Sequence, residues 1–122
     1  MSTKYLGKPG GQPVDDLDVF DAPAGCTRVV MTSDEVTAIC PVTGQPDHYT
    51  VSIDYVPDRY CIESKSLKLY LWHFRDIGVF CEQLSVDIRD KVRGAISPRE
   101  VTVTVVQKAR GGITIEATSH HP

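Results

Sequence analysis

The stretch His48-Tyr-Thr-Val-Ser-Ile-Asp-Tyr-Val56 alternates apolar and polar side chains and decides the class of fold. A period of two is typical of a β-strand that buries one face and exposes the other. The apolar side chains that would share the inner face are Tyr49, Val51, Ile53 and Tyr55. Pro57 follows directly and ends the alternation. We therefore predict a strand over residues 48–56.

Further elements are predicted on both sides of this strand. Three runs rich in β-branched residues predict strands over residues 27–32, 101–107 and 113–117. Apolar residues three or four positions apart predict helices over residues 66–76 and 79–92. The predicted order is ββααββ. It implies an α+β fold in which two helices cover one face of a four-stranded antiparallel sheet.

Length and composition limit the class of protein. The chain has 122 residues, of which 41% are hydrophobic and 24% charged, as in an ordinary globular domain. Residues 1–25 contain glycine and proline without periodicity, so we expect an N-terminal arm or loop there and a single folded domain over residues 26–122. No run approaches the roughly 18 apolar residues of a membrane span. A net charge of −3 argues against a nucleic-acid partner.

The cysteines and the N-terminus suggest a compartment. The first residues lack the apolar segment of a secretory signal, and the four cysteines form no CxxC pair. This pattern argues against a disulfide scaffold, a zinc ribbon and a thioredoxin motif. We expect a cytoplasmic protein with reduced thiols.

The small sheet also predicts association between copies of the chain. Four strands covered by two helices leave two strand edges unpaired. Joining several sheets into a ring would remove those edges. A homo-oligomer is therefore expected on physical grounds alone.

The loop Cys40-Pro-Val-Thr-Gly-Gln-Pro-Asp47 is the first candidate site. Two prolines and a glycine favour a tight, rigid turn, which can bring the Asp47 carboxyl near the Cys40 sulfur. A positioned thiolate is an efficient nucleophile, and a neighbouring acid can supply the proton that the attacked group needs. The alternative is that Asp47 is a turn residue that binds backbone amides.

The segment Glu63-Ser-Lys-Ser-Leu-Lys-Leu-Tyr70 is the second candidate. Ser64 could be the N-cap of the first helix, and Lys65 and Lys68 lie on one side of its first turns. Amides, hydroxyls and ammonium groups at a helix start can bind a phosphate. The alternative is a solvated helix face with a capping serine.

The third candidate is Glu82, at the start of the second helix. An inward-facing carboxylate there could accept two N–H bonds from a guanine-like edge, because an ionised carboxylate is a bidentate acceptor. The alternative is a surface glutamate on an amphipathic helix.

Taken together, these segments resemble one family. From about residue 32 to 115 the chain is similar to the short, single-domain NADPH-dependent 7-cyano-7-deazaguanine reductases, the nitrile reductases of queuosine biosynthesis. The resemblance rests on the two segments quoted above and on shorter motifs, namely Tyr55-Val-Pro-Asp58, Phe74-Arg75, Phe80-Cys-Glu82 and Arg110-Gly-Gly112. It implies a tunnelling fold whose ββααββ subunits form pentameric rings stacked as a decamer, with active sites between subunits.

The resemblance also implies a role for individual residues. Cys40 matches the nucleophile that forms a covalent thioimide with the nitrile, and Asp47 matches the proton donor. The residues matching those that hold the deazaguanine are Ile62, Glu63, Ser64, Cys81 and Glu82. The residues matching those associated with NADPH are Lys65, Ser66, Lys68 and Arg110, with Arg110 reaching from a neighbouring subunit. No metal is implied.

One position departs from the family pattern, because Cys81 stands where histidine is usual. A thiol is shorter and a weaker hydrogen-bond partner than an imidazole.

The resemblance also implies the overall reaction. Two NADPH molecules would take the nitrile to a primary amine, 7-aminomethyl-7-deazaguanine.

Three alternatives remain open. The related archaeosine-forming amidinotransferase shares the fold, the cysteine and the acid but acts without NADPH on tRNA-bound deazaguanine. A zinc enzyme of the cyclohydrolase branch would need a His/Cys ligand set, for which the histidines are few. A catalytically weak purine- or pterin-binding module would not need both Cys40 and Asp47.

Overall fold

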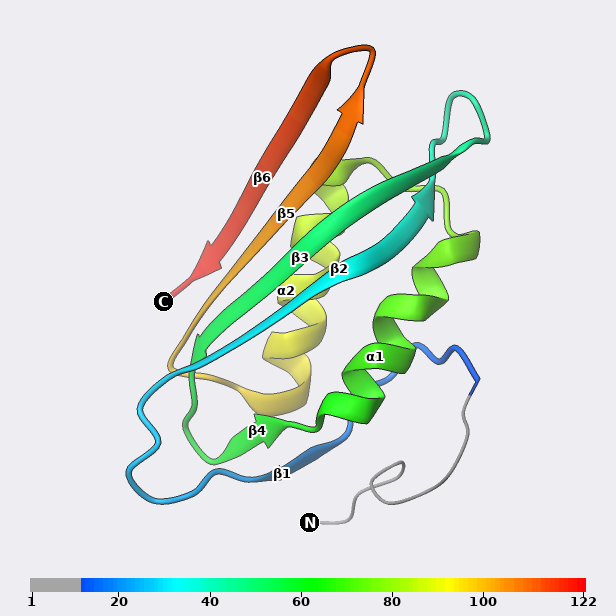
Figure 1. Cartoon of the computed structure of the whole chain (residues 1–122). Coiled ribbons are helices and arrows are strands. Elements are labelled where there is room, and N and C mark those ends of the chain that lie inside the picture. The colour runs from blue at the N-terminus through cyan, green and yellow to red at the C-terminus, as the bar shows by residue number, and fades with distance from the viewer. Residues whose placement is uncertain (1–11) are drawn as a thin grey trace.

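The computed structural model describes residues 12–122, which form six strands, two α-helices and one 3-10 turn (Figure 1). The strands are β1 (Val19–Asp21), β2 (Val29–Ile39), β3 (Pro46–Val56), β4 (Tyr60–Ile62), β5 (Glu100–Arg110) and β6 (Ile113–His121). The helices are α1 (Ser64–His73) and α2 (Cys81–Ile96), and the 3-10 turn η1 (Phe74–Asp76) continues α1.

The main sheet is antiparallel with the strand order β2-β3-β5-β6, and both helices lie on one of its faces (Figure 1). The predicted α+β class and the ββααββ order of the main elements are confirmed. The alternation in β3 acts as predicted, because its apolar side chains are buried against the helices while the polar ones between them are partly exposed. Hydrophobic burial of this face holds the two layers together.

The first helix begins earlier than predicted, and its cap is a different residue. Residue 63, not Ser64, is the N-cap: the Glu63 carboxylate accepts from the backbone N–H groups of Lys65 at 2.8 Å and Ser66 at 2.7 Å. A carboxylate in that position accepts hydrogen bonds from two free N–H groups at the helix start. Its negative charge also interacts favourably with the positive end of the helix dipole. Ser64 is consequently the first helical residue, and its side chain is exposed.

The second helix begins and ends later in the sequence than predicted. It starts at Cys81 and continues to Ile96 because Ile88, Val92 and Ile96 extend the apolar stripe by one more turn. Ser97 then adopts a left-handed conformation with φ 43° and ends the helix.

The N-terminal boundary was predicted wrongly. Part of the expected arm is folded: β1 pairs with β4 as a small antiparallel sheet, and Leu17 and Asp18 are buried. The Ser66 hydroxyl accepts from the Asp18 N–H at 2.8 Å, and Asp18 C=O accepts from the Glu63 N–H at 2.9 Å. Three-residue strands carry too little pattern to be seen in sequence, and long-range pairing stabilises them. The folded unit therefore extends N-terminally at least to Leu17.

Both long edges of the main sheet, β2 and β6, lack a neighbouring strand within the described chain. Exposed apolar side chains accompany these edges, including Val30 on β2 and Ile113 on β6, which are 56% and 66% exposed. Two open edges of this kind are suited to pairing with further strands.

Candidate active site

The Cys40 loop is a tight turn between β2 and β3, as predicted. Cys40 N–H donates to Gln45 C=O at 2.8 Å, and Gly44 N–H donates to Cys40 C=O at 2.9 Å. Gly44 has φ 72°, a left-handed conformation that glycine adopts without steric cost. The turn holds the half-buried Cys40 at the end of β2, where a ligand can reach its sulfur.

The turn also activates the thiol. Hydrogen bonds from the Thr43 hydroxyl and from the backbone N–H groups of Thr43 and Val42 lower the pKa of Cys40, because they stabilise the thiolate. Thr43 is a neighbour of the candidate nucleophile that the sequence reasoning missed. A hydroxyl three residues after a cysteine in a turn rich in proline and glycine was the available signal.

Asp47 lies beside Cys40 and is only 5% exposed. Its carboxylate forms an ion pair with the Arg110 guanidinium, which also donates to Gln45 Oε1 at 2.6 Å. The partner of Asp47 is thus a side chain of β5 and not the backbone amides of its own turn. The ion pair raises the pKa of Arg110 and keeps it charged.

Arg110 was expected to contact a cofactor from a neighbouring subunit. In the described chain it instead bridges Asp47 and Gln45 within its own active-site loop. A rotation of this half-exposed side chain would be needed before it reached anything else.

The start of α2 is tied to the same corner of the sheet. Ile39 N–H donates to Ile77 C=O at 2.9 Å, and Val79 N–H donates to Ile39 C=O at 3.1 Å. Since Ile39 precedes Cys40, these bonds bring the Phe80-Cys81-Glu82 segment next to the Cys40 turn. Two backbone hydrogen bonds thus hold together segments that lie about forty residues apart in the sequence.

Cys81 is a buried thiol that donates to Val105 C=O on β5 at 3.5 Å. Burial raises the pKa of Cys81, the opposite of the shift at Cys40. Of the two thiols at this corner, Cys40 is therefore the one whose surroundings favour the thiolate, while Cys81 packs between helix and sheet. This packing explains why a small side chain fits at position 81.

Glu82 follows Cys81 and its side chain is exposed. The expectation of an inward-facing carboxylate is wrong for the single chain, because the first turn of α2 points residue 82 away from the sheet. An exposed carboxylate beside Cys40 can still accept hydrogen bonds from a ligand bound on that surface.

The other group of predicted residues lies at the opposite end of the sheet. Ile62 N–H donates to the Tyr55 hydroxyl at 3.0 Å, which fixes Ile62, Glu63 and Ser64 beside that end of β3. Tyr55 is eight residues from Asp47, which is roughly 26 Å along an extended strand. Within one chain these residues cannot share a site with Cys40.

Ser66 does not offer its hydroxyl to a ligand. It is fully buried, accepts from Asp18 N–H and donates to Glu63 C=O at 2.8 Å. Its role is to join the N-terminal segment to the start of α1, and the prediction of a cofactor contact is not supported by this position.

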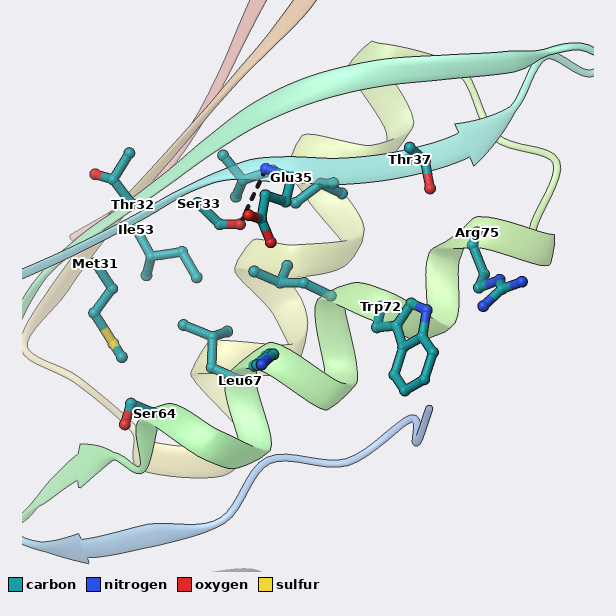
Figure 2. A pocket seen from close by; sticks show the side chains of 14 residues that line it. Met31, Thr32, Ser33, Glu35, Thr37, Ile53, Ser64, Leu67, Trp72 and Arg75 are labelled. Carbon is teal, nitrogen blue, oxygen red and sulfur yellow. Dashed lines mark hydrogen bonds between the residues drawn. The ribbon is translucent and has the colours of Figure 1, made fainter. Parts of the chain in front are cut away.

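A groove of about 920 Å³ lies between β2 and α1 (Figure 2). Its floor is apolar, with Leu67 and Ile53 facing inward, and its rim is polar. Lys68 lines it, and at its far end the Arg75 guanidinium lies 5.6 Å from the centre of the Trp72 ring. Lys65 does not line the groove but lies on the preceding turn of α1, half-buried.

These groups fit a dinucleotide. Lys68 and Arg75 supply positive charge for phosphates, and Trp72, which is 41% exposed, offers a flat apolar surface to a ring. Glu35 on β2 is the acidic group that faces them. The groove runs from Ser64 to Thr37, three residues before Cys40, and so leads from one group of predicted residues towards the other.

The fold and this corner of the sheet define a class. A ββααββ sheet carrying an activated thiol beside a buried carboxylate places the chain among tunnelling-fold proteins, as predicted. A family profile described as QueF-like protein matches residues 46–122. The chain belongs to this QueF-like family.

Curated relatives agree with this assignment. A protein of Chlorobium phaeovibrioides is 45% identical over 86% of this chain and 92% of its own length, and one of Frankia casuarinae is 42% identical over 98% and 95%. Both are named NADPH-dependent 7-cyano-7-deazaguanine reductase.

The fold also matches a solved structure. The crystal structure of the archaeosine synthase QueF-Like in the apo form superposes with a TM-score of 0.73 and 26% identity, covering 77% of this chain and 92% of that chain. This similarity supports the tunnelling fold.

Proposed function

We propose that this chain is an NADPH-dependent nitrile reductase that converts 7-cyano-7-deazaguanine to 7-aminomethyl-7-deazaguanine in queuosine biosynthesis. The observation that carries the proposal is the Cys40 thiol, whose pKa is lowered by the turn and which lies beside the buried carboxylate of Asp47. A nitrile resists direct reduction, and thiolate addition converts it to a more reactive thioimide.

The proton balance follows from the resting ion pair. Asp47 paired with Arg110 is a carboxylate and can take the proton of the Cys40 thiol. The sulfur then bonds to the nitrile carbon, one π pair moves to nitrogen, and Asp47 returns the proton there. The thioimide thus forms with no outside acid, and Asp47 acts as the predicted proton donor in the second half of the step.

We assign NADPH to the groove between β2 and α1. Bound there, it supplies the hydrides of the reduction. Lys68 and Arg75 would bind its phosphates, and Trp72 would pack against one of its rings. Lys65, on the preceding turn of α1, would add positive charge near the entrance.

We propose that a second copy completes the site. Glu63 and Ser64 lie at the far end of β3 from Cys40, so they can hold the deazaguanine only when they come from a neighbouring chain. Pairing of β2 of one chain with β6 of the next would join subunits edge to edge and end the exposure of both edges. Pentameric rings stacked as a decamer fit this arrangement.

The ligand is a small deazapurine, and neither a nucleic-acid nor a membrane partner enters the proposal. In the described residues no helix is long and apolar enough to cross a bilayer. Four free thiols fit a reducing cytoplasm, which is where we place the reaction.

The test is to trap the adduct. Enzyme mixed with 7-cyano-7-deazaguanine and no NADPH should gain the mass of one nitrile on the Cys40 peptide, and adding NADPH should then release the amine. Cys40→Ala should lose both the adduct and turnover. Cys26→Ala, which removes another half-exposed thiol, is the matched control and should keep both. An adduct on Cys61 or Cys81 would overturn the assignment.

A second function is favoured by one observation, the similarity in fold to an archaeosine synthase. An amidinotransferase would form the same adduct on Cys40 but would consume no NADPH. Oxidation of NADPH that depends on the nitrile therefore separates the two.

A further inference from the structure

Tyr49 carries a buried polar group that the proposed function does not use. The residue is fully buried on β3, and its hydroxyl has no hydrogen-bond partner, alone among the buried side-chain oxygens and nitrogens of residues 12–122. Leaving such a hydroxyl unpaired in the protein interior costs free energy, because its hydrogen bonds to water are lost and not replaced. Native proteins rarely retain this cost without a reason, so the hydroxyl calls for a partner that is absent from the free chain.

The sheet register places Tyr49 at the catalytic corner. Asp47 and Tyr49 are two residues apart on β3 and both face the helices, because alternate residues share a face. Their partners on β2 are Ala38 and Val36, so Tyr49 lies one step further than Asp47 from the Cys40 turn.

The start of α2 lies over the same place. Cys81 donates to the carbonyl of Val105, whose ladder partner on β3 is Val51, the next inward residue after Tyr49. Tyr49 therefore projects towards the layer that holds Cys81. The ionisable groups that influence the Tyr49 hydroxyl are all predicted site residues, namely Asp47, Cys81, Cys40 and Glu82.

The same surroundings determine how the hydroxyl can act. Burial first, and then the charge of Asp47, raise the pKa of Tyr49 far above its ordinary value. The phenol keeps its proton throughout the working pH range, so its O–H can donate to an incoming acceptor without being ionised first. An acceptor that develops negative charge would gain most from this donor.

We propose that the Tyr49 hydroxyl donates a hydrogen bond to the nitrile nitrogen of the substrate while the Cys40 sulfur adds to the nitrile carbon. This rests on the proposed function. The sulfur–carbon bond forms, the π pair moves onto nitrogen, and the thiol proton reaches nitrogen through Asp47. Tyr49 keeps its own proton and stabilises the charge on nitrogen before that proton arrives. A dry, unpartnered donor has no water to displace when the nitrogen approaches.

The test is Tyr49→Phe, which removes one oxygen and preserves the ring. Adduct formation with 7-cyano-7-deazaguanine in a single turnover without NADPH should slow about a hundredfold, the usual loss when one donor to a developing charge is removed. Alkylation of Cys40 by iodoacetamide, which has no nitrile nitrogen, should keep its rate. A merely structural disturbance would slow both reactions.

Stability gives a second readout. The thermal midpoint of Tyr49→Phe should equal or slightly exceed that of the parent, because no hydrogen bond is lost. Tyr55→Phe is the contrast: it deprives the Ile62 N–H of its acceptor and should lower the midpoint. If Tyr49→Phe lost as much stability as Tyr55→Phe, the hydroxyl would have a structural partner and the inference would fail.

Failures of the two proposals can be told apart. If the parent protein forms no adduct, the proposed function is wrong. If the parent forms it and Tyr49→Phe forms it equally fast, only the inference is wrong. Should Tyr49→Phe not fold, site-specific 3-fluorotyrosine at position 49 keeps the shape and strengthens the donor. Faster adduct formation would support the role, and an unchanged or slower rate would contradict it.

Discussion

Cys40 and Cys81, two thiols at the same corner of the sheet, acquire opposite chemistry from their surroundings. Turn donors stabilise the thiolate of Cys40, whereas burial between α2 and β5 favours the neutral thiol of Cys81. The difference depends on which groups face each sulfur, and the residue type is the same. The most informative test at this scale is therefore a change to a donor that leaves the cysteine itself in place.

Thr43→Val should make Cys40 less reactive. The substitution keeps the β-branched shape and removes the hydroxyl that gives the largest lowering of the Cys40 pKa. Since that hydrogen bond favours the charged form, its loss raises the pKa, and the pH profile of Cys40 alkylation should move to higher pH. The rate at neutral pH should fall several-fold. Thr114→Val on β6 should leave the profile unchanged, and an unshifted profile in Thr43→Val would show that the backbone donors suffice.

At the scale of elements, α1 carries two separate duties. At its N-terminus the Glu63 carboxylate accepts from the Ser66 N–H, and the Ser66 hydroxyl accepts from the Asp18 N–H. These bonds link the helix start to the N-terminal segment. The exposed side of α1 faces the groove along β2 with Lys68 and Trp72, and Arg75 of η1 continues this side (Figure 2). The first duty concerns stability, and the second is the cofactor binding that we propose for the groove.

Lys68→Ala should weaken NADPH binding and spare the nitrile step. We expect a KM for NADPH raised about tenfold, as when one charge-assisted phosphate contact is lost, with the Cys40 adduct forming at the parent rate. Steady-state kinetics and adduct trapping measure the two effects separately. Lys91→Ala is the control, because Lys91 pairs with Asp15 elsewhere on the helical layer. Loss of the adduct with an unaltered KM would assign Lys68 another role.

Leu17→Ala should show that the N-terminal segment belongs to the fold. Leu17 is 7% exposed within the core, so truncation should lower the free energy of unfolding by about 2–4 kcal/mol. Denaturant unfolding followed by fluorescence measures the change. Phe20→Ala on β1, where the side chain is 36% exposed, should cost clearly less. Equal and small losses for both variants would indicate that the segment only rests on the domain.

The whole molecule separates its functional residues between two ends. Cys40, Asp47, Arg110 and the start of α2 share one end of the sheet, and the start of α1 lies at the other (Figure 1). A site that needs both ends has to be assembled from two chains. Mixing two variant chains, each altered at one end, can therefore test whether the site is shared.

Cys40→Ala and Ser64→Trp should each be inactive alone and should complement each other when mixed. Ser64 is exposed on the first turn of α1, so a bulky side chain there blocks ligand and not folding. Random assembly of equal amounts pairs two intact halves at about a quarter of the sites, and NADPH oxidation should recover to about that share. A mixture of Cys40→Ala with Cys40→Ser should remain inactive. Failure of the first pair to complement would place the site within one chain.

The sequence by itself determined the order of the main elements, the inward face of β3 and the turn that holds Cys40. These features depend on local rules: a period of two, helical spacing, and the conformations of proline and glycine. The same rules predicted that Cys40 and Asp47 lie close together, because they are only seven positions apart in the chain. The motif Phe80-Cys-Glu82 at the start of the second helix was also recognisable in the sequence. The groups that surround it in the folded chain were not.

The tertiary structure decided what depends on distant contacts. It folded part of the expected arm by pairing β1 with β4, and it made Glu63 the helix cap and Ser66 an internal link. It joined Arg110 to Asp47 across sixty-three positions, exposed Glu82, and left the Tyr49 hydroxyl without a partner. Pattern fixes which face a residue belongs to. Only packing fixes which polar group it meets there, because partners far apart in sequence are chosen by the arrangement of whole elements.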